Sequence, residues 1–199
     1  MTTDKDFRSL AFSPDDIPSD LVIETQTRQP VPLGEESLEF HAARLLLLLK
    51  FAGGRKARII GRTKIAKMDF FVRYPTYLVK AANMHSIQST VRPGARPESP
   101  MIRYKYGPWD KKYYDVFALL VARDLIAVCP SDKGDVFALT DRGQLAVDEL
   151  QGPEFEEIIG RCCLVYRLFG GKSGTQIKSF IYDNFPEIVA RPIGWEIKQ

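Results

Sequence analysis

The second half of the chain follows an order of short segments that limits the fold more than any other feature. Residues 113–124 are rich in apolar side chains and predict a helix. Thr140 is a favourable N-cap residue and predicts the start of another helix just after a second apolar run. The expected segments are a helix at 113–124, strands at 125–128 and 136–139, a turn at 130–135, and a capped helix at 140–150.

This order resembles the back half of winged helices of the MarR and PadR types. In those folds a helix packs on a two-stranded ribbon, and the turn between the strands projects as the wing. The most specific stretch is Leu139-Thr140-Asp141-Arg142-Gly143, a strand end that leads into a capped helix. The resemblance implies a mainly α-helical fold with a small β-ribbon (α+β). It also implies a winged helix-turn-helix core with extra N- and C-terminal helices.

Local signals predict further helices around that core. The run at 45–49 is apolar all round and indicates a buried helix that Gly53-Gly54 ends. Between Arg62 and Tyr74 the apolar residues form one stripe, with most of the basic residues outside it, and Pro75 ends the pattern. We expect helices at 37–51, 62–74, 76–84, 154–169 and 175–184, a strand at 101–106, a long loop at 85–100, and a turn at 107–110 with Asp110 as an N-cap.

These segments divide the chain into three parts. Residues 1–36 form an extended arm that four prolines interrupt, in which only 21–23 has the pattern of a strand or docking segment. Residues 37–150 form the winged-helix-type domain, and residues 151–199 form a C-terminal helical extension packed on it.

Charge is distributed unevenly along the chain. The formal net charge is +3, but residues 50–112 hold 15 Lys and Arg against three acids, a net charge of +12, while the rest carries −9. A basic block between acidic flanks is typical of a polyanion partner, here the backbone of double-stranded DNA, or of a solvated basic face. The candidate nucleic-acid-binding residues are Arg55, Lys56, Arg58, Arg62, Lys64, Lys67, Arg73, Lys111 and Lys112.

The predicted recognition elements are poor readers of base sequence. Helix 113–124 offers few polar side chains, and the turn at 130–135 carries Asp132, Lys133 and Asp135, which is net acidic. Base readout in the major groove needs Arg, Asn or Gln. We therefore expect contact with the phosphate backbone, which needs charge but no base code.

Two stretches, Gly61 to Pro75 (GRTKIAKMDFFVRYP) and Arg103 to Asp110 (RYKYGPWD), resemble the middle components of bacterial three-component ABC-ATPase defence systems of the Lamassu type. The resemblance covers about residues 37–150 and brings no catalytic motif. It implies a non-enzymatic subunit that joins an SMC-like (Rad50-like) coiled-coil ATPase to an effector, often a nuclease, in anti-phage defence. Tyr74, Tyr106 and Trp109 are the candidate partner-binding residues, with placement in the core as the alternative.

The residue inventory does not favour an enzyme. The two histidines, His41 and His85, and the three cysteines have no catalytic or metal-ligand spacing. Gly171-Lys172-Ser173 ends like a P-loop, but Tyr166 stands where that motif requires glycine. We expect no cofactor and no metal.

The sequence also bears on the cellular location and on the functional class of the protein. Apolar runs such as 45–49 are far shorter than the roughly 18–20 residues of a membrane span, and the polar start at 1–6 is unlike a secretory signal. A cytoplasmic protein without a membrane partner is expected. The alternative to the adaptor is a free-standing winged-helix transcriptional regulator, which would bind DNA as a homodimer through a charged recognition helix.

Overall fold

The structure is a computed structural model that describes residues 37–94 and 100–198. These residues all belong to one compact unit. The predicted arm at 1–36, including the segment at 21–23, lies outside the described residues. Within the described ranges, no helix combines the length and the apolarity that crossing a bilayer requires.

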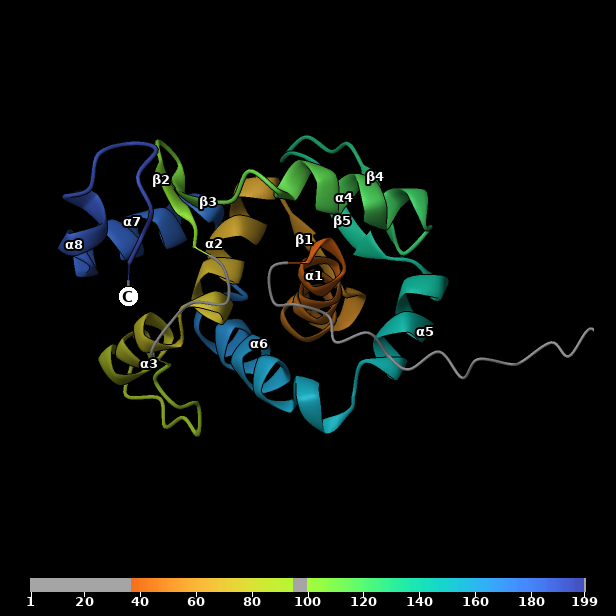
Figure 1. The fold of residues 1–199 in the computed structure, drawn as a ribbon, viewed down its shortest axis with the longest axis horizontal. Coiled ribbons are helices and arrows are strands. Elements are labelled where there is room, and N and C mark those ends of the chain that lie inside the picture. The colour runs from red at the N-terminus through yellow and green to blue at the C-terminus, as the bar shows by residue number, and fades with distance from the viewer. Residues whose placement is uncertain (1–36, 95–99, 199) are drawn as a thin grey trace, which may run out of the picture. The chain divides into compact units, whose positions relative to one another are not determined.

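The described unit is mainly helical with two small antiparallel sheets, as the sequence predicts at the level of an α+β fold (Figure 1). The helices are α1 (Leu38–Ala52), α2 (Arg62–Arg73), α3 (Pro75–Met84), α4 (Tyr113–Ala122), α5 (Asp141–Glu149), α6 (Glu156–Phe169), α7 (Gly174–Asn184) and α8 (Pro186–Val189), with 3-10 turns η2 (Gly54–Lys56) and η3 (Pro153–Phe155). The strands are β1 (Arg58–Ile60), β2 (Ile102–Tyr104), β3 (Gly107–Trp109), β4 (Ile126–Cys129) and β5 (Val136–Leu139).

Helix α1 lies at the centre of the unit, with α4, α5, α6 and strand β1 around it (Figure 1). Its N-cap is Ser37, whose hydroxyl accepts a hydrogen bond from the Phe40 amide at 3.1 Å. The leucines at 45–49 are all buried, which confirms the burial predicted from their all-round apolar pattern. This helix therefore forms the middle of the hydrophobic core.

The larger sheet has three antiparallel strands in the order β1-β5-β4. The β4–β5 hairpin and the cap on α5 are as predicted, and Thr140 Oγ1 accepts from the Gly143 amide at 3.0 Å. A side chain at Gly143 would collide with the Leu125 carbonyl oxygen, so this position requires glycine. Strand β1 was not predicted, because a three-residue strand is defined by its distant partner β5 and not by a local pattern.

The expected turn at 107–110 is wrong. Gly107 instead begins strand β3, which pairs with β2, and its positive φ of 115° allows the chain to reverse there. The N-cap of α4 is Lys112 and not Asp110 as expected. Asp110 Oδ1 instead accepts a hydrogen bond from the Lys112 amide at 2.9 Å, just before the helix begins. Asp110 follows this hairpin directly and is buried.

Helix α2 is buried on all sides from Ile65 to Arg73, not along a single stripe. It packs against α3, α6, α7 and strand β3. Lys67 and Arg73, which we expected outside the apolar stripe, are therefore only 3% and 0% exposed. Helix α6 contacts α1, α2 and α3, so residues beyond 150 belong to the same core as the predicted winged-helix part.

Candidate nucleic-acid interface

A cavity of about 390 Å³ gathers basic side chains from three distant parts of the chain. Lys64 and Lys67 come from α2, Lys133 comes from the β4–β5 turn, and Lys178 comes from α7. We call this site the lysine cavity. Two of these lysines, Lys64 and Lys67, belong to the nucleic-acid-binding set predicted from the sequence.

The backbone near Gly61 brings α2 next to the β4–β5 turn. Gly61 has a φ of 91°, and its amide donates to the Asp135 carbonyl at 2.8 Å. Its own carbonyl accepts from the Lys64 amide at 3.0 Å, which starts the helix. This glycine therefore turns the chain from β1 into α2 at the rim of the cavity.

The start of α7 forms the opposite wall. Ser173 caps this helix in a capping box, with its hydroxyl accepting from the Gln176 amide and its amide donating to Gln176 Oε1. Lys64 Nζ donates to the Gly170 carbonyl at 3.0 Å and so ties α2 to the turn before α7. The first residues of α2 and α7 both line the cavity, and helix N-termini add positive potential to that of the lysines.

Lys67 is the most constrained of the four lysines. Its aliphatic stem lies under Gly107, where an added Cβ would come within 3.2 Å of Lys67 Cε. Its Nζ donates to the Thr63 carbonyl at 2.9 Å. Burial, with a contribution from nearby Lys178, lowers the pKa of Lys67 to about 8, and burial also lowers the pKa of Lys64.

No carboxylate lines this cavity among the described residues. The residues that line the cavity include no Asp and no Glu, and none of the four lysines there lies within ion-pair distance of a described carboxylate. Like charges that repel without a counterion raise the free energy of the empty site. An anion bound in the cavity would remove that penalty.

The remaining predicted cations lie around this cavity or away from it. Arg58 lines a neighbouring hollow together with Lys64. Arg62 is exposed, pairs with Asp135 at 3.3 Å, and stands 5.9 Å from the ring of Tyr114. Arg55, Lys56 and Lys111 are exposed, and Lys112 is half-buried.

Two of the predicted contact residues are buried, so the prediction that they lie in an interface is wrong. Arg73, expected to meet nucleic acid, is fully buried and pairs with Asp110 at 2.7 Å. Tyr74, expected to meet a partner, is also fully buried; its hydroxyl donates to the Ile197 carbonyl and accepts from the Met101 amide. Both side chains come from the end of α2, where the core closes around them.

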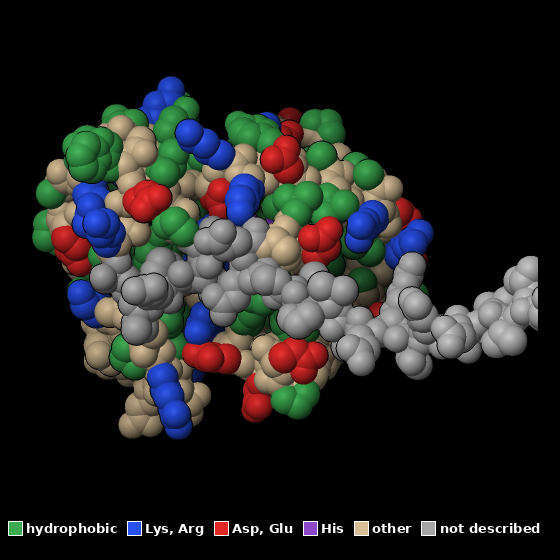
Figure 2. Space-filling model, in the orientation of Figure 1, with side chains coloured by type: hydrophobic (Ala, Val, Ile, Leu, Met, Phe, Trp, Pro, Cys, Tyr) green, Lys and Arg blue, Asp and Glu red, His purple; other side chains and the backbone are tan. Residues whose placement is uncertain are grey.

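The other two predicted partner residues are accessible to different degrees. Tyr106 is 51% exposed and lines the lysine cavity. Trp109 is half-buried, with its ring 5.2 Å from that of Tyr113 and 5.8 Å from that of Tyr114. In the view of Figure 2, basic and acidic side chains are interspersed, so that face is not one continuous basic surface.

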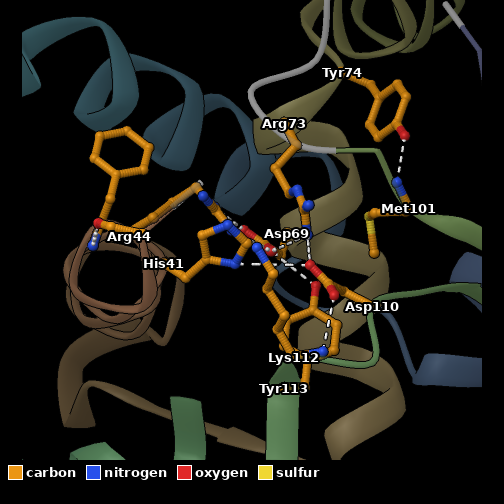
Figure 3. A network of polar contacts seen from close by, with 11 residues as sticks. His41, Arg44, Asp69, Arg73, Tyr74, Met101, Asp110, Lys112 and Tyr113 are labelled. Carbon is orange, nitrogen blue, oxygen red and sulfur yellow. Dashed lines mark hydrogen bonds and ion pairs between the residues drawn. The ribbon is translucent and has the colours of Figure 1, made fainter. Parts of the chain in front are cut away.

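Arg73 belongs to a buried network of charges, drawn in Figure 3. His41 and Arg44 reach it from α1, Asp69 and Arg73 from α2, and Asp110 and Tyr113 from the start of α4 and the residues before it (Figure 3). Arg44 Nε donates to Asp69 Oδ1 at 2.7 Å, and the Tyr113 hydroxyl donates to Asp69 Oδ2 at 2.7 Å. We call these six residues the buried network.

Electrostatics inside the network favour fixed protonation states. Burial alone would raise the pKa of Asp69, but Arg44 and Arg73 hold it below its usual value. Burial, with help from the two arginines, lowers the pKa of His41 to about 4. Burial also raises the pKa of Tyr113 well above its usual value, so this phenol remains a donor.

The buried network lies away from the hollows formed by the described residues. Its six residues are at most 7% exposed, and they line none of the hollows described here. Its charges instead tie α1, α2 and α4 together at fixed distances.

The sequence analysis missed Lys133, Lys178 and the start of α7 as parts of the cavity. Lys178 lies far from the central basic block, and its role follows only from the packing of α7 against α2. The Gly171-Lys172-Ser173-Gly174 stretch gave a partial signal, because a glycine-rich turn that leads into a helix is typical of anion sites.

Neither metal-binding groups in the described residues nor comparisons with known proteins add to the assignment of this site. Residues 37–94 and 100–198 contain no group of three or more His, Cys, Asp or Glu side chains placed to hold a metal ion. No family model, curated protein or solved structure matches this chain. Its function is therefore inferred from the geometry of the site.

Proposed function

We propose that the chain is a non-enzymatic, cytoplasmic adaptor subunit, built on a winged helix, that holds the backbone of nucleic acid in the lysine cavity. We further propose that it binds an SMC-like coiled-coil ATPase and an effector in a bacterial anti-phage complex. The observation that carries the nucleic-acid part is the cavity itself, where four lysines meet without a carboxylate in its lining. Phosphate contact needs charge and reach, both of which this site offers.

The winged-helix assignment is supported by the order of elements around the larger sheet. Helix α4 precedes the β4–β5 hairpin, α5 follows it, and β1 adds a third strand beside β5. The turn between β4 and β5 occupies the position of a wing and carries Lys133 to the lysine cavity. In this assignment, the wing contributes one phosphate contact and no base readout.

The exposed face of α4 supports protein contact rather than base recognition. Val121 on α4 and Val128 on β4 are 48% and 39% exposed, and both line an apolar hollow of about 370 Å³. Asp115 is the only charged residue of this helix. A helix of this composition suits a protein partner and lacks the donors that read bases in the major groove.

Charge reversal in the lysine cavity tests the nucleic-acid part. The variant is Lys133→Glu with Lys178→Glu, which avoids the buried Lys67. Fluorescence anisotropy with a random-sequence duplex should show affinity about 10-fold lower or more at low salt, and the slope of log K against log salt should fall by about 2. Arg142→Glu, at an exposed position on α5, is the matched control and should leave both quantities unchanged.

An unchanged affinity in the double variant, with the same unfolding curve as the wild type, would remove nucleic acid from the proposal. The adaptor part is tested by copurification of the chain with the products of its neighbouring genes. A large ATPase should travel with it. A lone homodimer that selects a palindromic duplex would instead favour the free-standing regulator.

A further inference from the structure

A second hollow opens beside the lysine cavity and has a different lining. Its volume is about 410 Å³, and Thr63 and Tyr106 line both sites. Four of its eight lining residues are aromatic. Tyr104, Tyr106, Trp109 and Tyr114 supply these rings, and Arg62 and Lys111 supply two cations. We call this site the aromatic hollow.

The rings of this hollow are exposed in a way that the core aromatics are not. Tyr106 is 51% and Tyr114 is 59% exposed, while Phe70 and Phe71 on α2 are fully buried. The rings also cluster here: the exposed Tyr104 and Tyr106 have ring centroids 5.9 Å apart, and the half-buried Trp109 lies 5.8 Å from the exposed Tyr114. A group of exposed aromatic rings on one wall is typical of a binding surface.

Cations alternate with these rings. Lys105 Nζ lies 4.8 Å from the centroid of Tyr106, and Arg62 Cζ lies 5.9 Å from that of Tyr114. The lining of the hollow includes no Asp and no Glu among the described residues, although Asp135 pairs with Arg62 at 3.3 Å. The two adjoining sites therefore offer flat π-faces on one side and positive charge on the other.

A single-stranded nucleic acid matches both halves of this surface. Its unstacked bases can stack on tyrosine rings, while its phosphates follow a positively charged groove. In a duplex the bases are stacked on one another, so only the phosphates and the groove edges remain available. The backbone of a duplex accounts for the lysines but gives the tyrosines no role.

We propose that the aromatic hollow and the lysine cavity together bind single-stranded nucleic acid, with bases stacked on Tyr106 and Tyr114 and the adjoining phosphates among the lysines. This inference rests on the proposed function, since it assumes that this surface contacts nucleic acid. It adds the class of ligand and assigns the exposed tyrosines to it. Arg62, which lies at Tyr114, belongs to the same contact.

The test compares two labelled probes in anisotropy titrations: an oligothymidine of about 20 nucleotides and a duplex of equal length, since this length exceeds the roughly 4–16 nucleotides that a stacking site covers. The wild type should bind the single strand about 10-fold more tightly. Tyr106→Ala with Tyr114→Ala should weaken single-strand binding by about 10-fold or more and leave duplex binding within about 2-fold, because stacking is lost and charge is kept.

Two further variants control this result. Tyr106→Phe with Tyr114→Phe keeps the rings and should retain single-strand binding. Trp195→Ala removes an exposed aromatic ring, 63% accessible, that lines neither hollow and should change nothing. All these positions are exposed, and matching unfolding curves will show that each variant is folded.

The outcomes separate this inference from the proposed function. One outcome would overturn the inference alone. In that outcome Lys133→Glu with Lys178→Glu abolishes duplex binding, the wild type shows no preference for the single strand, and Tyr106→Ala with Tyr114→Ala has no effect. Absence of binding to either nucleic acid would overturn both. A polyglutamate peptide is the competing ligand. If it binds as tightly as the oligothymidine, and Tyr106→Ala with Tyr114→Ala does not weaken its binding, the surface fits an acidic protein and the inference is overturned.

Discussion

Helix α2 supplies charged residues to two regions that treat charge in opposite ways. Its second half carries Asp69 and Arg73 into the buried network, where Arg44 and Arg73 each lie 2.7 Å from a carboxylate. Its first half carries Lys64 and Lys67 to the lysine cavity, whose lining has no carboxylate among the described residues. In the buried network, cations and carboxylates of the chain neutralise one another. In the lysine cavity, we expect a bound anion to neutralise the lysines.

The two regions also differ in what their charges do for the fold. Buried ion pairs contribute little net stability, because desolvation of both partners offsets their attraction, but they fix geometry. Asp69 contacts residues of α1, α2 and α4 at once, so it sets how these helices meet. In the described part of the chain, Lys64 and Lys67 of the lysine cavity donate to carbonyl oxygens but form no ion pair, so their charges cost stability that binding can offset.

The largest expected effect comes from the buried network. Asp69→Ala removes the carboxylate that lies 2.7 Å from the buried Arg44, while Arg73 keeps Asp110, and we expect the free energy of unfolding to fall by about 3–5 kcal/mol. Urea denaturation measures this loss. A change below about 1 kcal/mol would contradict it, since it would show that water or another group takes over the role of Asp69.

The next effect depends on pH and comes from His41. Its pKa is about 4 in the folded chain, against 6.5 as the ordinary value, so the unfolded state binds more protons between these pH values. Stability should therefore rise with pH from about 4 to 6.5 and be lost as pH falls through that window, by a total on the order of 3 kcal/mol. Denaturation of His41→Gln across this range should give a flatter profile, and an identical slope would exclude His41 as the titrating group.

The smallest effect has the opposite sign and lies in the lysine cavity. Lys67→Met keeps the apolar stem under Gly107 and removes an ammonium that burial and Lys178 disfavour. We expect stability to be unchanged or to increase by up to about 1 kcal/mol, together with weaker binding of nucleic acid. Thermal unfolding and anisotropy measure the two quantities. A clear loss of stability would mean that the bond from Lys67 Nζ to the Thr63 carbonyl is a structural tie.

The parts of the fold that the sequence predicted are those with local signals. Ser37 and Thr140 mark helix starts because their hydroxyls accept from amides three residues ahead. Pro75 separates α2 from α3 because it cannot continue a helix. Each of these features is decided within a few residues, so pattern alone suffices.

The parts that the sequence did not predict depend on partners far along the chain. The pairing of Arg73 with Asp110 spans 37 residues, and the pairing of Arg44 with Asp69 spans 25. Their burial cannot be read from the helix pattern, which places Arg73 outside the apolar stripe. Arg44 offered one usable signal, because a cation next to the run at 45–49 requires a buried acid.

The candidate site was predicted to the same partial extent. The basic block located Lys64 and Lys67, whereas Lys133 and Lys178 enter only through tertiary packing, Lys178 through that of α7 on α2. The aromatic hollow combines the β2–β3 hairpin and the following start of α4 with the start of α2, which lies about 40 residues earlier in the sequence. Charge counts therefore located half of the surface, and tertiary contacts determined the rest.

Helix α2 serves both the lysine cavity and the buried network. The rotation of its residues about the helix axis is therefore as important as their types. A single residue inserted between Lys67 and Asp69 would rotate everything after it by about 100°. Asp69 and Arg73 would then face away from Arg44 and Asp110, while Lys64 would keep its place beside Gly170. Changes in length are consequently far better tolerated after Met84, where the helices give way to a loop, than anywhere inside this twelve-residue segment.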